Sequence, residues 1–312
     1  MDKKIDVNEQ NVFAVINPIA GHSDAEEIQG AVKDLCARRR WTFEMHETSS
    51  EDDLAEITRT AIKDGATMVL VAGGDGTVGA VINGVVHSNV PLGIIPVGTG
   101  NGLARALKIP LQINDVMTLF DGEYDIHDID TMQVGDFFAV LNVSAGISAR
   151  AMQQTEPEDK RRLGILAYAQ TIIKDLTATK PFLYKLNLDG MEIRVRATEV
   201  LVSNGKLLKE PPFLFGTPET LDDGRLEVNI LTAEKPTEYA RLAWDLLLDP
   251  NQSAKDLHDL AVHQSIELNV VDTPQLVQAD GEIIGETPTE VRLVPKSLKV
   301  IIPFSEHEKG ER

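Results

Sequence analysis

Up to about residue 120, the chain alternates two hydrophobic patterns, and this alternation restricts the possible folds more than any other feature. Short apolar runs, typical of buried strands, are separated by stretches whose apolar residues recur every three or four positions, as on one face of a helix. Strands that alternate with helices favour a parallel sheet with helices on both faces. The expected strands are residues 12–17, 41–47, 67–72 and 92–96, and the expected helices are 24–39, 51–65, 77–86 and 102–109.

The pattern changes after about residue 124. Strand-like segments then follow one another, and the pair Asp189-Gly190 lies between two of them, as expected for a tight β-hairpin. Helical patterns interrupt them at 160–178 and 237–249. We therefore expect the second half of the chain to be mainly antiparallel β, with a domain boundary near 120–127.

Composition and charge narrow the possible functions. Cys36 is the one cysteine, and the N-terminal residues lack the apolar core of a signal peptide, so we expect a cytoplasmic protein without an intrachain disulfide. The sequence contains no run of about 18 apolar residues, so no transmembrane helix is expected. The net charge of −19 argues against non-specific binding of nucleic acid. It also argues against broad attachment to anionic lipid, which leaves only a local basic patch for that role.

Two glycine-rich turns follow expected strands, and both indicate phosphate binding. The first is GGDGT at 73–77 and the second is GTGN at 98–101, each directly before an expected helix. Such turns lie at the carboxyl edge of a parallel sheet, where glycines let the backbone approach a phosphate and the helix start supplies free amides. The candidate phosphate-binding residues are Gly73, Gly74, Gly76, Thr77, Gly98, Thr99, Gly100 and Asn101.

Asp75 is the unusual member of the first turn. A carboxylate beside a phosphate is repelled unless a cation lies between them, and Mg²⁺, which takes one or two carboxylates and keeps several waters, fits that position. The alternative is a tight turn in which Asp75 caps the helix, and in the second loop Gly98 and Gly100 would then only turn the chain. Asn17, at the end of the first expected strand, is either a ligand of a base or phosphate or a turn residue.

The ordered set of motifs resembles the diacylglycerol kinase-like lipid kinases, whose catalytic domain is shared with sphingosine and ceramide kinases. The resemblance runs along nearly the whole chain and is closest to the small soluble bacterial members. GGDGT alone also has close relatives in NAD kinases and phosphofructokinases, so the ordered set carries the resemblance. The motifs are NPIAG at 17–21, ET at 47–48, GGDGT at 73–77, IIPVGTGN at 94–101, DIDTMQV at 128–134, EPEDKRRLGILAYA at 156–169, LVSNG at 201–205, TLDDGRLEV at 220–228 and ADGE at 279–282.

The resemblance implies a fold and a place for ATP. It implies a nucleotide-binding α/β domain at 1–125 and a β-sandwich lipid-substrate domain at 126–312, with the active site in the cleft between them. The last roughly 20 residues would pack back on the first domain. By the resemblance, ATP is held by Thr48, by the stretch from Gly73 to Gly79, which includes Val78, and by Thr99.

The resemblance also implies catalytic and metal-binding roles. Glu282 matches the general base, while Asp75 and Asp130 match carboxylates of a network of magnesium and water. Asp223, with the backbone oxygens of Thr220 and Arg225, matches a second, structural magnesium site. Without the resemblance, Glu282 would be interpreted as a turn residue and Asp223 as a solvated residue at the start of a strand.

Two departures from the family pattern affect the predicted site. Gly102 stands where close bacterial relatives carry an aspartate, although sphingosine kinase-like relatives have a small residue there. Gly79 and Ala80 replace an Asn-Glu pair in the helix after GGDGT. One carboxylate of the cation network and two polar groups near the nucleotide are thus missing. We expect these losses to affect magnesium affinity, nucleotide choice or activity.

Three functional hypotheses follow. The leading one is an ATP- and Mg²⁺-dependent kinase of a membrane-derived lipid, with diacylglycerol as the default and a sphingoid base or another lipid alcohol as alternatives. The second is a kinase of a soluble acceptor such as NAD, against which the LDDGRL and ADGE motifs speak. The third is a nucleotide-binding regulator with little activity, against which the retained Asp75 and Glu282 speak.

The expected partner is a lipid substrate at a membrane surface, reached by peripheral contact. The basic run at 159–163 is a candidate membrane contact, with a solvated face as its alternative. The apolar run at 207–215 is a candidate lip that admits a lipid, with ordinary packing as its alternative. The sequence leaves a homodimer open.

Overall fold

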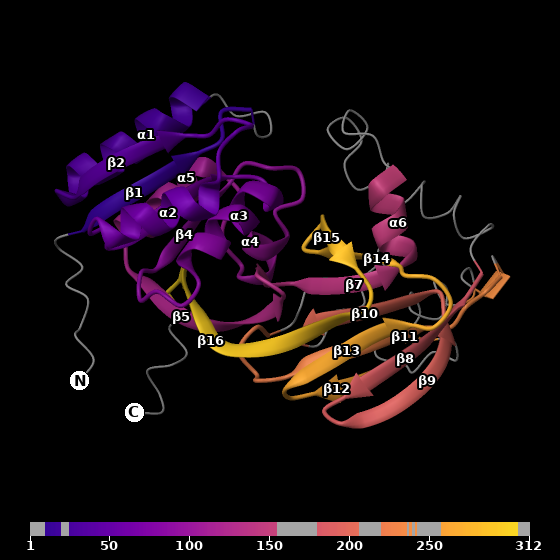
Figure 1. The fold of residues 1–312 in the computed structure, drawn as a ribbon. Helices are drawn as coiled ribbons and strands as arrows, with labels where there is room; N and C mark the ends of the chain where they lie inside the picture. Colours follow the sequence, from indigo (N-terminus) through magenta and orange to yellow (C-terminus); the bar gives the residue numbers. More distant parts are fainter. Residues whose placement is uncertain are drawn as a thin grey trace. The chain divides into compact units, whose positions relative to one another are not determined.

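The computed structural model describes residues 10–19, 25–154, 180–205, 220–235, 237–238, 241 and 257–304 of the 312-residue chain (Figure 1). These residues group into two compact units. Unit 1 comprises the described residues up to Ile129 together with those from Lys296 onward, and unit 2 runs from Asp130 to Pro295. The chain therefore leaves unit 1 once and returns to it near its C-terminal end.

Unit 1 is built on a parallel sheet, as the sequence predicts. Its strands are β1 (Asn11–Ile16), β2 (Thr42–Glu47), β3 (Met68–Gly73), β4 (Leu92–Pro96) and the second half of β16 (Thr289–Pro303). They lie in the order β2-β1-β3-β4-β16. The register is parallel throughout this order, with Val12 opposite Phe43 and Met68, and Leu92 opposite Val69 and Val300.

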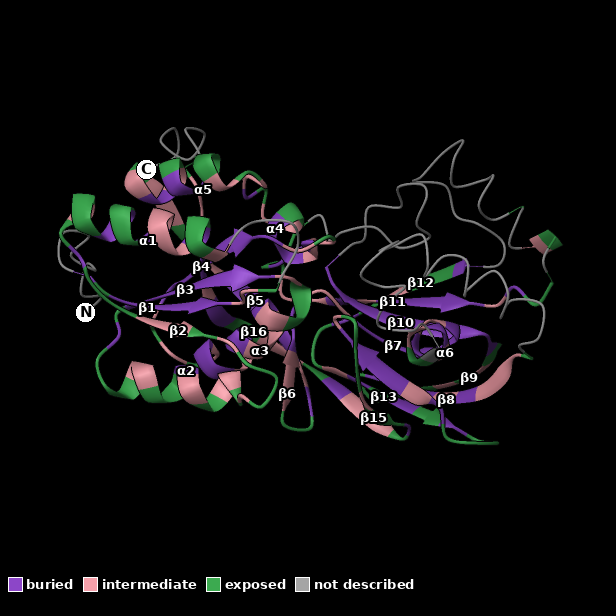
Figure 2. Ribbon diagram, turned by 90° about the horizontal axis from the view of Figure 1, so that it is seen from above, coloured by how far each residue is buried: buried purple, intermediate pink, exposed green. Residues whose placement is uncertain are grey.

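Helices cover both faces of this sheet, which confirms the predicted α/β architecture (Figure 2). They are α1 (Ala25–Arg39), α2 (Leu54–Lys63), α3 (Asp75–Val85), α4 (Gly102–Ala106) and α5 (Ile113–Asp121). α1 packs against α5 and α2 packs against α3, and Figure 2 shows the two pairs on opposite sides of the strands. The residues that predict α1, Ile28, Val32 and Leu35, are all buried. Within the described ranges, no helix is long and apolar enough to cross a membrane.

The sequence pattern does not predict α5. This helix has nine residues, and the side chains that it buries are Val116, Met117 and Phe120. Two turns are too few for a clear helical period, so the signal is lost between Pro110 and the change of pattern that follows. In the structure, Arg38 Nε donates to the carboxylate of Asp121 at 2.7 Å, which ties the end of α5 to the end of α1.

The strand order of unit 1 contains a topological switch. The chain runs from β1 outward to β2 and then returns to the other side of β1 to form β3. The loops after β1 and β3 therefore leave the sheet in opposite directions and open a crevice at the carboxyl ends of these strands, where open α/β sheets bind ligands. The first glycine-rich turn follows β3 and so lies at this switch.

Unit 2 is a β-sandwich of mainly antiparallel strands, as the family resemblance implies. Its elements are the end of β5 (Tyr124–Val134), β6 (Phe137–Ala139), β7 (Asn142–Gly146), α6 (Ile147–Gln154), β8 (Phe182–Leu188), β9 (Met191–Ala197), β10 (Glu199–Asn204), β11 (Leu226–Leu231), β12 (Leu257–Val262), β13 (Ser265–Val270), β14 (Leu276–Ala279), β15 (Glu282–Glu286) and the first half of β16. One sheet has the order β12-β11-β10-β7-β14-β15, and in the other β13 pairs with β16 and β8, and β8 with β9. Apolar side chains from both sheets, such as Val143, Tyr184, Val228 and Ile266, share one core.

The sequence patterns locate the strands of unit 2 only in part. The hairpin around Asp189-Gly190 is confirmed. The structure also has a turn at Gly135-Asp136 between β5 and β6. The strands from β12 to β15 are not predicted one by one, because each has only four to six residues and several of their outward positions are polar. The helix expected at 160–178 lies outside the described residues, as does nearly all of the one expected at 237–249.

Asp189 fixes its hairpin turn to the segment between β12 and β13, two strands that belong to different sheets. The turn residues Asp189 and Gly190 have φ values of 49° and 93°, as the two-residue turns that match strand twist require. The Asp189 carboxylate accepts hydrogen bonds from three successive amides, those of His263, Gln264 and Ser265, at 2.6, 3.0 and 2.9 Å. Desolvation is the largest single influence and raises the pKa of Asp189, but these three bonds and the nearby His263 together hold it below its ordinary value.

Replacing Asp189 with Asn is expected to lower the free energy of unfolding at neutral pH by roughly 1 kcal/mol, because an exposed group gains less than a buried one from charge-assisted hydrogen bonds. A lowered folded-state pKa stabilises the fold above the ordinary aspartate pKa, and this contribution is lost as the pH falls through the lowered value. The difference between the wild type and Asp189→Asn should therefore persist down to about pH 4 and shrink below it. Urea unfolding as a function of pH measures it, with Asp136→Asn in an exposed turn as the matched control. A constant difference down to pH 2 would contradict the assignment.

Candidate functional site

The first glycine turn joins β3 to α3 at the switch point. Gly74 is extended, with φ −86° and ψ −178°, and precedes the first helical residue, Asp75. No side chain caps the start of α3, so its first-turn amides are available to an anion. A Cβ at Gly73 would lie 2.5 Å from the Cβ of Thr77, which shows that only glycine fits where the strand meets the helix.

The second glycine turn packs backbone to backbone against the first. A Cβ added to Gly98 would lie 2.5 Å from the Cα of Gly74, and one added to Gly100 would lie 2.5 Å from the Asp75 carboxylate. Asn101 is in the left-handed conformation, and its side chain accepts from the Gly98 amide at 2.9 Å and donates to the Gly98 carbonyl at 2.7 Å. Asn101 thus fixes the shape of its own turn, which the sequence does not reveal.

Asp75 links the two turns. One of its carboxylate oxygens accepts from the Asn101 amide at 2.9 Å and the other from the Gly102 amide at 2.6 Å. The carboxylate therefore caps α4, a different helix from the one that Asp75 begins. A carboxylate has about four lone-pair directions, and two of them are occupied by these amides. The remaining directions leave Asp75 able to bind Mg²⁺, directly or through a water.

Asn17 and Thr77 connect the loop after β1 to α3. Asn17 Nδ2 donates to the Thr77 hydroxyl at 2.8 Å, and the Asn17 side-chain oxygen accepts from the Ile19 amide at 3.1 Å. Asn17 thus makes the bond of a turn residue and also contacts the first glycine turn, while its role as a ligand of a base or phosphate stays a prediction. Val78 is 6% exposed and faces the core, and its amide donates to the Gly74 carbonyl at 3.0 Å, so its side chain is not directed at a nucleotide.

Thr48 follows β2 in a loop with its own internal bonds. Its amide donates to the Ile16 carbonyl at 2.9 Å, which continues the ladder between β1 and β2. Further along this loop, the Asp52 carboxylate accepts from the Ser49 amide at 2.8 Å and lies 2.8 Å from His46 Nε2. The bonds from Ser49 and His46 lower the pKa of Asp52 to about 2. This loop is therefore ordered beside the carboxyl ends of β1 and β3.

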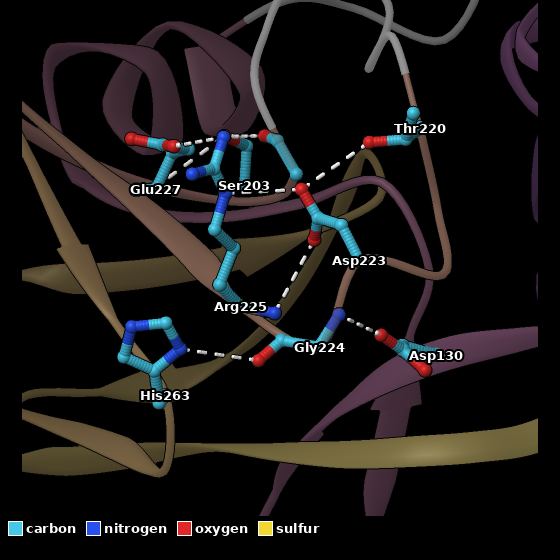
Figure 3. A network of polar contacts seen from close by, with 9 residues as sticks. Asp130, Ser203, Thr220, Asp223, Gly224, Arg225, Glu227 and His263 are labelled. Carbon is cyan, nitrogen blue, oxygen red and sulfur yellow. Dashed lines mark hydrogen bonds and ion pairs between the residues drawn. The ribbon is translucent and has the colours of Figure 1, made fainter.

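Asp130 is the centre of a buried polar cluster in unit 2 (Figure 3). It is 1% exposed, and its carboxylate accepts from the Gly224 amide at 2.9 Å. The Asp130 amide donates to the Leu221 carbonyl at 2.7 Å, and its carbonyl accepts from Asn204 Nδ2 at 2.7 Å. Asn204 is not among the predicted site residues, and its Oδ1 is buried without a hydrogen-bond partner among the residues that the structure describes. The only sequence signal for Asn204 is its position at the end of the strand in LVSNG.

The predicted metal ligands Thr220, Asp223 and Arg225 lie in the same turn (Figure 3). The Asp223 carboxylate accepts from the Thr220 hydroxyl at 3.3 Å and from the Arg225 amide and Nε at 3.2 and 3.0 Å. One carboxylate and two carbonyls are the oxygen donors that Mg²⁺ takes. Here the Arg225 guanidinium already neutralises Asp223 and also lies 3.2 Å from Glu227. The described residues contain no cluster of three or more His, Cys, Asp or Glu side chains suited to a metal.

The ADGE motif forms the turn between β14 and β15. Asp280 and Gly281 have φ values of 45° and 94°, and Ala279 pairs with Glu282 across a two-residue turn. The Asp280 carboxylate accepts from the amides of three successive residues, Val140, Leu141 and Asn142, at 2.6, 2.9 and 2.8 Å. Glu282 is exposed at the start of β15. The motif therefore holds a solvent-accessible carboxylate on a turn that is anchored by its neighbour.

Comparison with known proteins agrees with this arrangement. The family described as diacylglycerol kinase catalytic domain matches residues 11–134, and the family described as YegS C-terminal NAD kinase beta sandwich-like domain matches residues 141–302. The chain belongs to the diacylglycerol kinase-like lipid kinase family. It is accordingly an enzyme, a lipid kinase that transfers phosphate to an alcohol group.

Individual relatives span almost the whole chain. A diacylglycerol kinase of Bacillus subtilis is 27% identical over 96% of this chain and 97% of its own length. A diacylglycerol kinase of Mycobacterium tuberculosis is 25% identical over 94% of this chain and 95% of its own length. The crystal structure of a diacylglycerol kinase from Bacillus anthracis superposes with a TM-score of 0.74, covers 94% of this chain and 97% of its own, and at 24% identity shows a shared fold.

The structure shows where the residues that depart from the family pattern lie. Gly102 places its amide, rather than a carboxylate, beside Asp75. Gly79 and Ala80 lie in the first half of α3. Arg105, which the sequence analysis did not identify, donates from Nε to the Gly100 carbonyl at 2.9 Å and supports the second turn. The proposed membrane contacts at 159–163 and 207–215 lie outside the described residues.

Substituting Gly98 with Ala is expected to push the two glycine turns apart, because the new methyl would lie 2.5 Å from the Gly74 Cα. Forced overpacking of this kind costs about 1–3 kcal/mol in stability, and we expect at least a tenfold loss of ATP affinity. Isothermal titration with ATP and thermal unfolding measure the two effects. The matched control is Gly30→Ala in α1, where a Cβ meets nothing within 4 Å and should stabilise the helix by about 0.5–1 kcal/mol. Normal ATP affinity in Gly98→Ala would show that the turn contact does not shape the nucleotide site.

Proposed function

We propose that this lipid kinase uses ATP as phosphate donor, with Mg²⁺, and transfers the terminal phosphate to the hydroxyl of a membrane-derived lipid, with diacylglycerol as the leading acceptor. Under this proposal, unit 1 binds the donor, and unit 2 supplies the general base and the lipid-binding surface. The enzyme acts in the cytoplasm and meets its acceptor by peripheral contact with a membrane. The strongly acidic composition excludes attachment through a uniformly basic surface.

The observation that carries the proposal is the contact between the two glycine turns at the β1/β3 switch. The uncapped start of α3 offers amides to phosphate oxygens, and the absent Cβ at Gly98 lets the two backbones meet. Phosphoryl transfer depends mainly on positioned phosphates and on electrostatic stabilisation of the charge that develops on them. When bound, Mg²⁺ would neutralise phosphate charge, with Asp75 and Asp130 as the carboxylates that hold it or its waters.

Glu282 is the proposed general base. It is exposed, so a lipid hydroxyl can reach it, and Asp280 anchors its turn through three amides. A carboxylate in this position accepts the proton that the acceptor hydroxyl releases as its oxygen attacks the terminal phosphorus. The reaction then produces ADP and a lipid phosphate.

The second candidate function is phosphorylation of NAD. It is favoured by the description of the matched C-terminal family as NAD kinase beta sandwich-like. Two relatives that cover nearly the whole chain, from Bacillus subtilis and Mycobacterium tuberculosis, carry the name diacylglycerol kinase, which favours the lipid acceptor. An assay with labelled ATP, Mg²⁺ and a panel of diacylglycerol, sphingosine, ceramide, extracted membrane lipids and NAD separates the two. A labelled lipid product supports the lipid kinase proposal. Labelled NADP as the sole product would show an NAD kinase instead, and ATP binding without any product favours the nucleotide-binding regulator.

Replacing Glu282 with Gln is expected to lower the rate of lipid phosphorylation by about 10²–10⁴-fold, because the amide cannot accept the proton of the acceptor hydroxyl. ATP affinity should stay the same, and because Glu282 is exposed, stability should change by no more than about 0.5 kcal/mol. Steady-state kinetics with diacylglycerol vesicles measures the rate. Glu286→Gln, an exposed glutamate at the other end of β15, is the control and should keep full activity. An unimpaired Glu282→Gln enzyme would remove Glu282 from the mechanism.

If the turn at 220–225 binds a structural Mg²⁺, as proposed from the family pattern, adding Mg²⁺ should raise the melting temperature of the wild type. A ligand at a hundredfold excess over its Kd stabilises the folded state by about 2.7 kcal/mol. Asp223→Asn should lose most of this gain, because it removes the only carboxylate of the proposed ligand set. Asp222→Asn, the exposed neighbour, should keep it. Equal stabilisation by Mg²⁺ in the wild type and Asp223→Asn would show that the ion pair with Arg225 takes the place of the metal.

A further inference from the structure

A chain of hydrogen bonds runs through unit 2 from a buried carboxylate to the turn that carries Glu282. The carboxylate belongs to Glu199, the first residue of β10, which is 2% exposed. Ser148, near the start of α6, donates to it from its amide at 3.0 Å and from its hydroxyl. The Ser148 hydroxyl lies 2.5 Å from the hydroxyl of Ser144 in β7. Glu199 is thus bound to a pair of serines and has no role in the proposed reaction so far.

Gln278 continues the chain from the serines to the turn. Its Nε2 donates to the Ser144 hydroxyl and to Asn142 Oδ1, both at 2.8 Å, so both amide hydrogens are used. Its Oε1 accepts from the amide of Gly281 at 2.9 Å. Gly281 immediately precedes Glu282 in the chain. The side chain of Gln278 is therefore fixed in one orientation by three partners and reaches the backbone beside the proposed base.

The hydrogen bonds of this chain all point the same way. The Gly281 amide donates to Gln278, and Gln278 donates to Ser144. Because the Ser148 hydroxyl donates to Glu199, its oxygen is left to accept from Ser144. The direction thus follows from a fixed backbone donor at one end and a carboxylate at the other. Hydrogen bonds aligned in this way polarise one another in a medium of low dielectric constant.

The central part of the chain is buried, whereas Ser148 is half-buried and Gly281 is exposed. Ser144 is 0% exposed and Gln278 is 4% exposed. Burial raises the pKa of Glu199 above its ordinary value, and the hydrogen bonds from Ser148 and the Ile147 backbone oppose this rise. Nearby Tyr184 donates its hydroxyl to the Ala145 carbonyl at 2.9 Å instead of to Glu199. A buried acid with this many aligned donors specifies a single arrangement of its neighbours.

We propose that Glu199 and Gln278 are positioning residues that hold Glu282 for catalysis by fixing the amide of Gly281. The inference rests on the proposed role of Glu282 as general base. Two anchors then hold the turn, Asp280 through three amides of the segment before β7 and Gln278 through Gly281. A catalytic group on a two-residue turn needs such anchors, since a misplacement of about 1 Å can lower a rate by about 10²-fold.

The test uses three variants in which the polarity of the chain is changed without changing its size. In Glu199→Gln, an amide donor faces the donors of Ser148. In Gln278→Glu, a carboxylate replaces the group that donates to Ser144. In the double variant, the new amide at 199 donates to Ser148 and the serine hydroxyls turn round. The side-chain amide of Asn142 flips, so that its Nδ2 donates to residue 278. The new carboxylate at 278 also accepts from Ser144 and still accepts from Gly281. The double variant therefore restores a continuous chain that runs in the opposite direction.

We expect each single variant to lower kcat for lipid phosphorylation by about 10–100-fold, as the loss of outer-shell support does, with the KM for ATP unchanged. Amide hydrogen exchange of the peptide that contains Gly281 should become faster in each single variant. The double variant should recover at least about tenfold in kcat over the worse single variant, and its exchange should slow again, because coupled sites are strongly non-additive. The control is Thr198→Val, which removes a neighbouring buried hydroxyl bound to the carbonyls of Leu231 and Ala233. This variant should keep the kcat of the wild type and its rate of amide exchange at Gly281.

Several results would overturn the inference. One is a set of single variants whose kcat and Gly281 exchange match those of the wild type. Another is a double variant whose loss of kcat, expressed as a change in activation free energy, equals the sum of the changes in the two single variants. If a single variant fails to fold, Ser144→Ala breaks the chain without altering charge and must show the same fall in kcat and faster exchange. If the wild type phosphorylates no lipid, that result rejects the proposed function but not the hydrogen-bond chain. The chain is tested separately by the amide exchange of Gly281, and an unchanged exchange rate in the variants would reject it as well.

Discussion

The contact between the backbones of two glycine turns in unit 1 determines how its site is built. Gly74 and Gly98 come from different strand-to-helix turns, and a single methyl group on Gly98 would lie 2.5 Å from the Gly74 Cα. Because the turns touch, the Asp75 carboxylate can reach the amides of Asn101 and Gly102. The contact therefore joins two helix starts through one carboxylate, and it explains why both turns are rich in glycine.

Unit 2 uses the same chemical device three times, in places where a turn must be held without a large core. Asp189 and Asp280 each lie in an Asp-Gly turn between two strands, and each accepts hydrogen bonds from three successive amides of a distant segment. Asp130 accepts from the Gly224 amide in a similar way. A carboxylate that accepts several amides satisfies backbone donors that a loop would otherwise leave unpaired. These acids fix the turns that carry Glu282 and Asp223.

The sequence predicts the elements of unit 1 well and the partners of its polar residues poorly. Alternating patterns identify β1 to β4 and α1 to α4, and the position of GGDGT at a strand end follows from them. That Asp75 caps α4 could not be predicted, because its acceptor role depends on a contact between residues 26 and 27 positions apart in the chain. The same holds for Glu199 and Gln278, whose connection runs through two serines on neighbouring elements. Local patterns record periodicity and turns, whereas such bonds depend on the tertiary packing.

The path of the chain also has a consequence for synthesis. β4 pairs with the end of β16, so the sheet of unit 1 gains this parallel strand only after the residues of unit 2 have been made. Domains begin to fold from the N-terminus while the rest of the chain is still being made. Until β16 emerges, the outer side of β4 presents unpaired backbone groups of the kind that promote aggregation. The nascent protein should therefore depend on chaperones until β16 has left the ribosome.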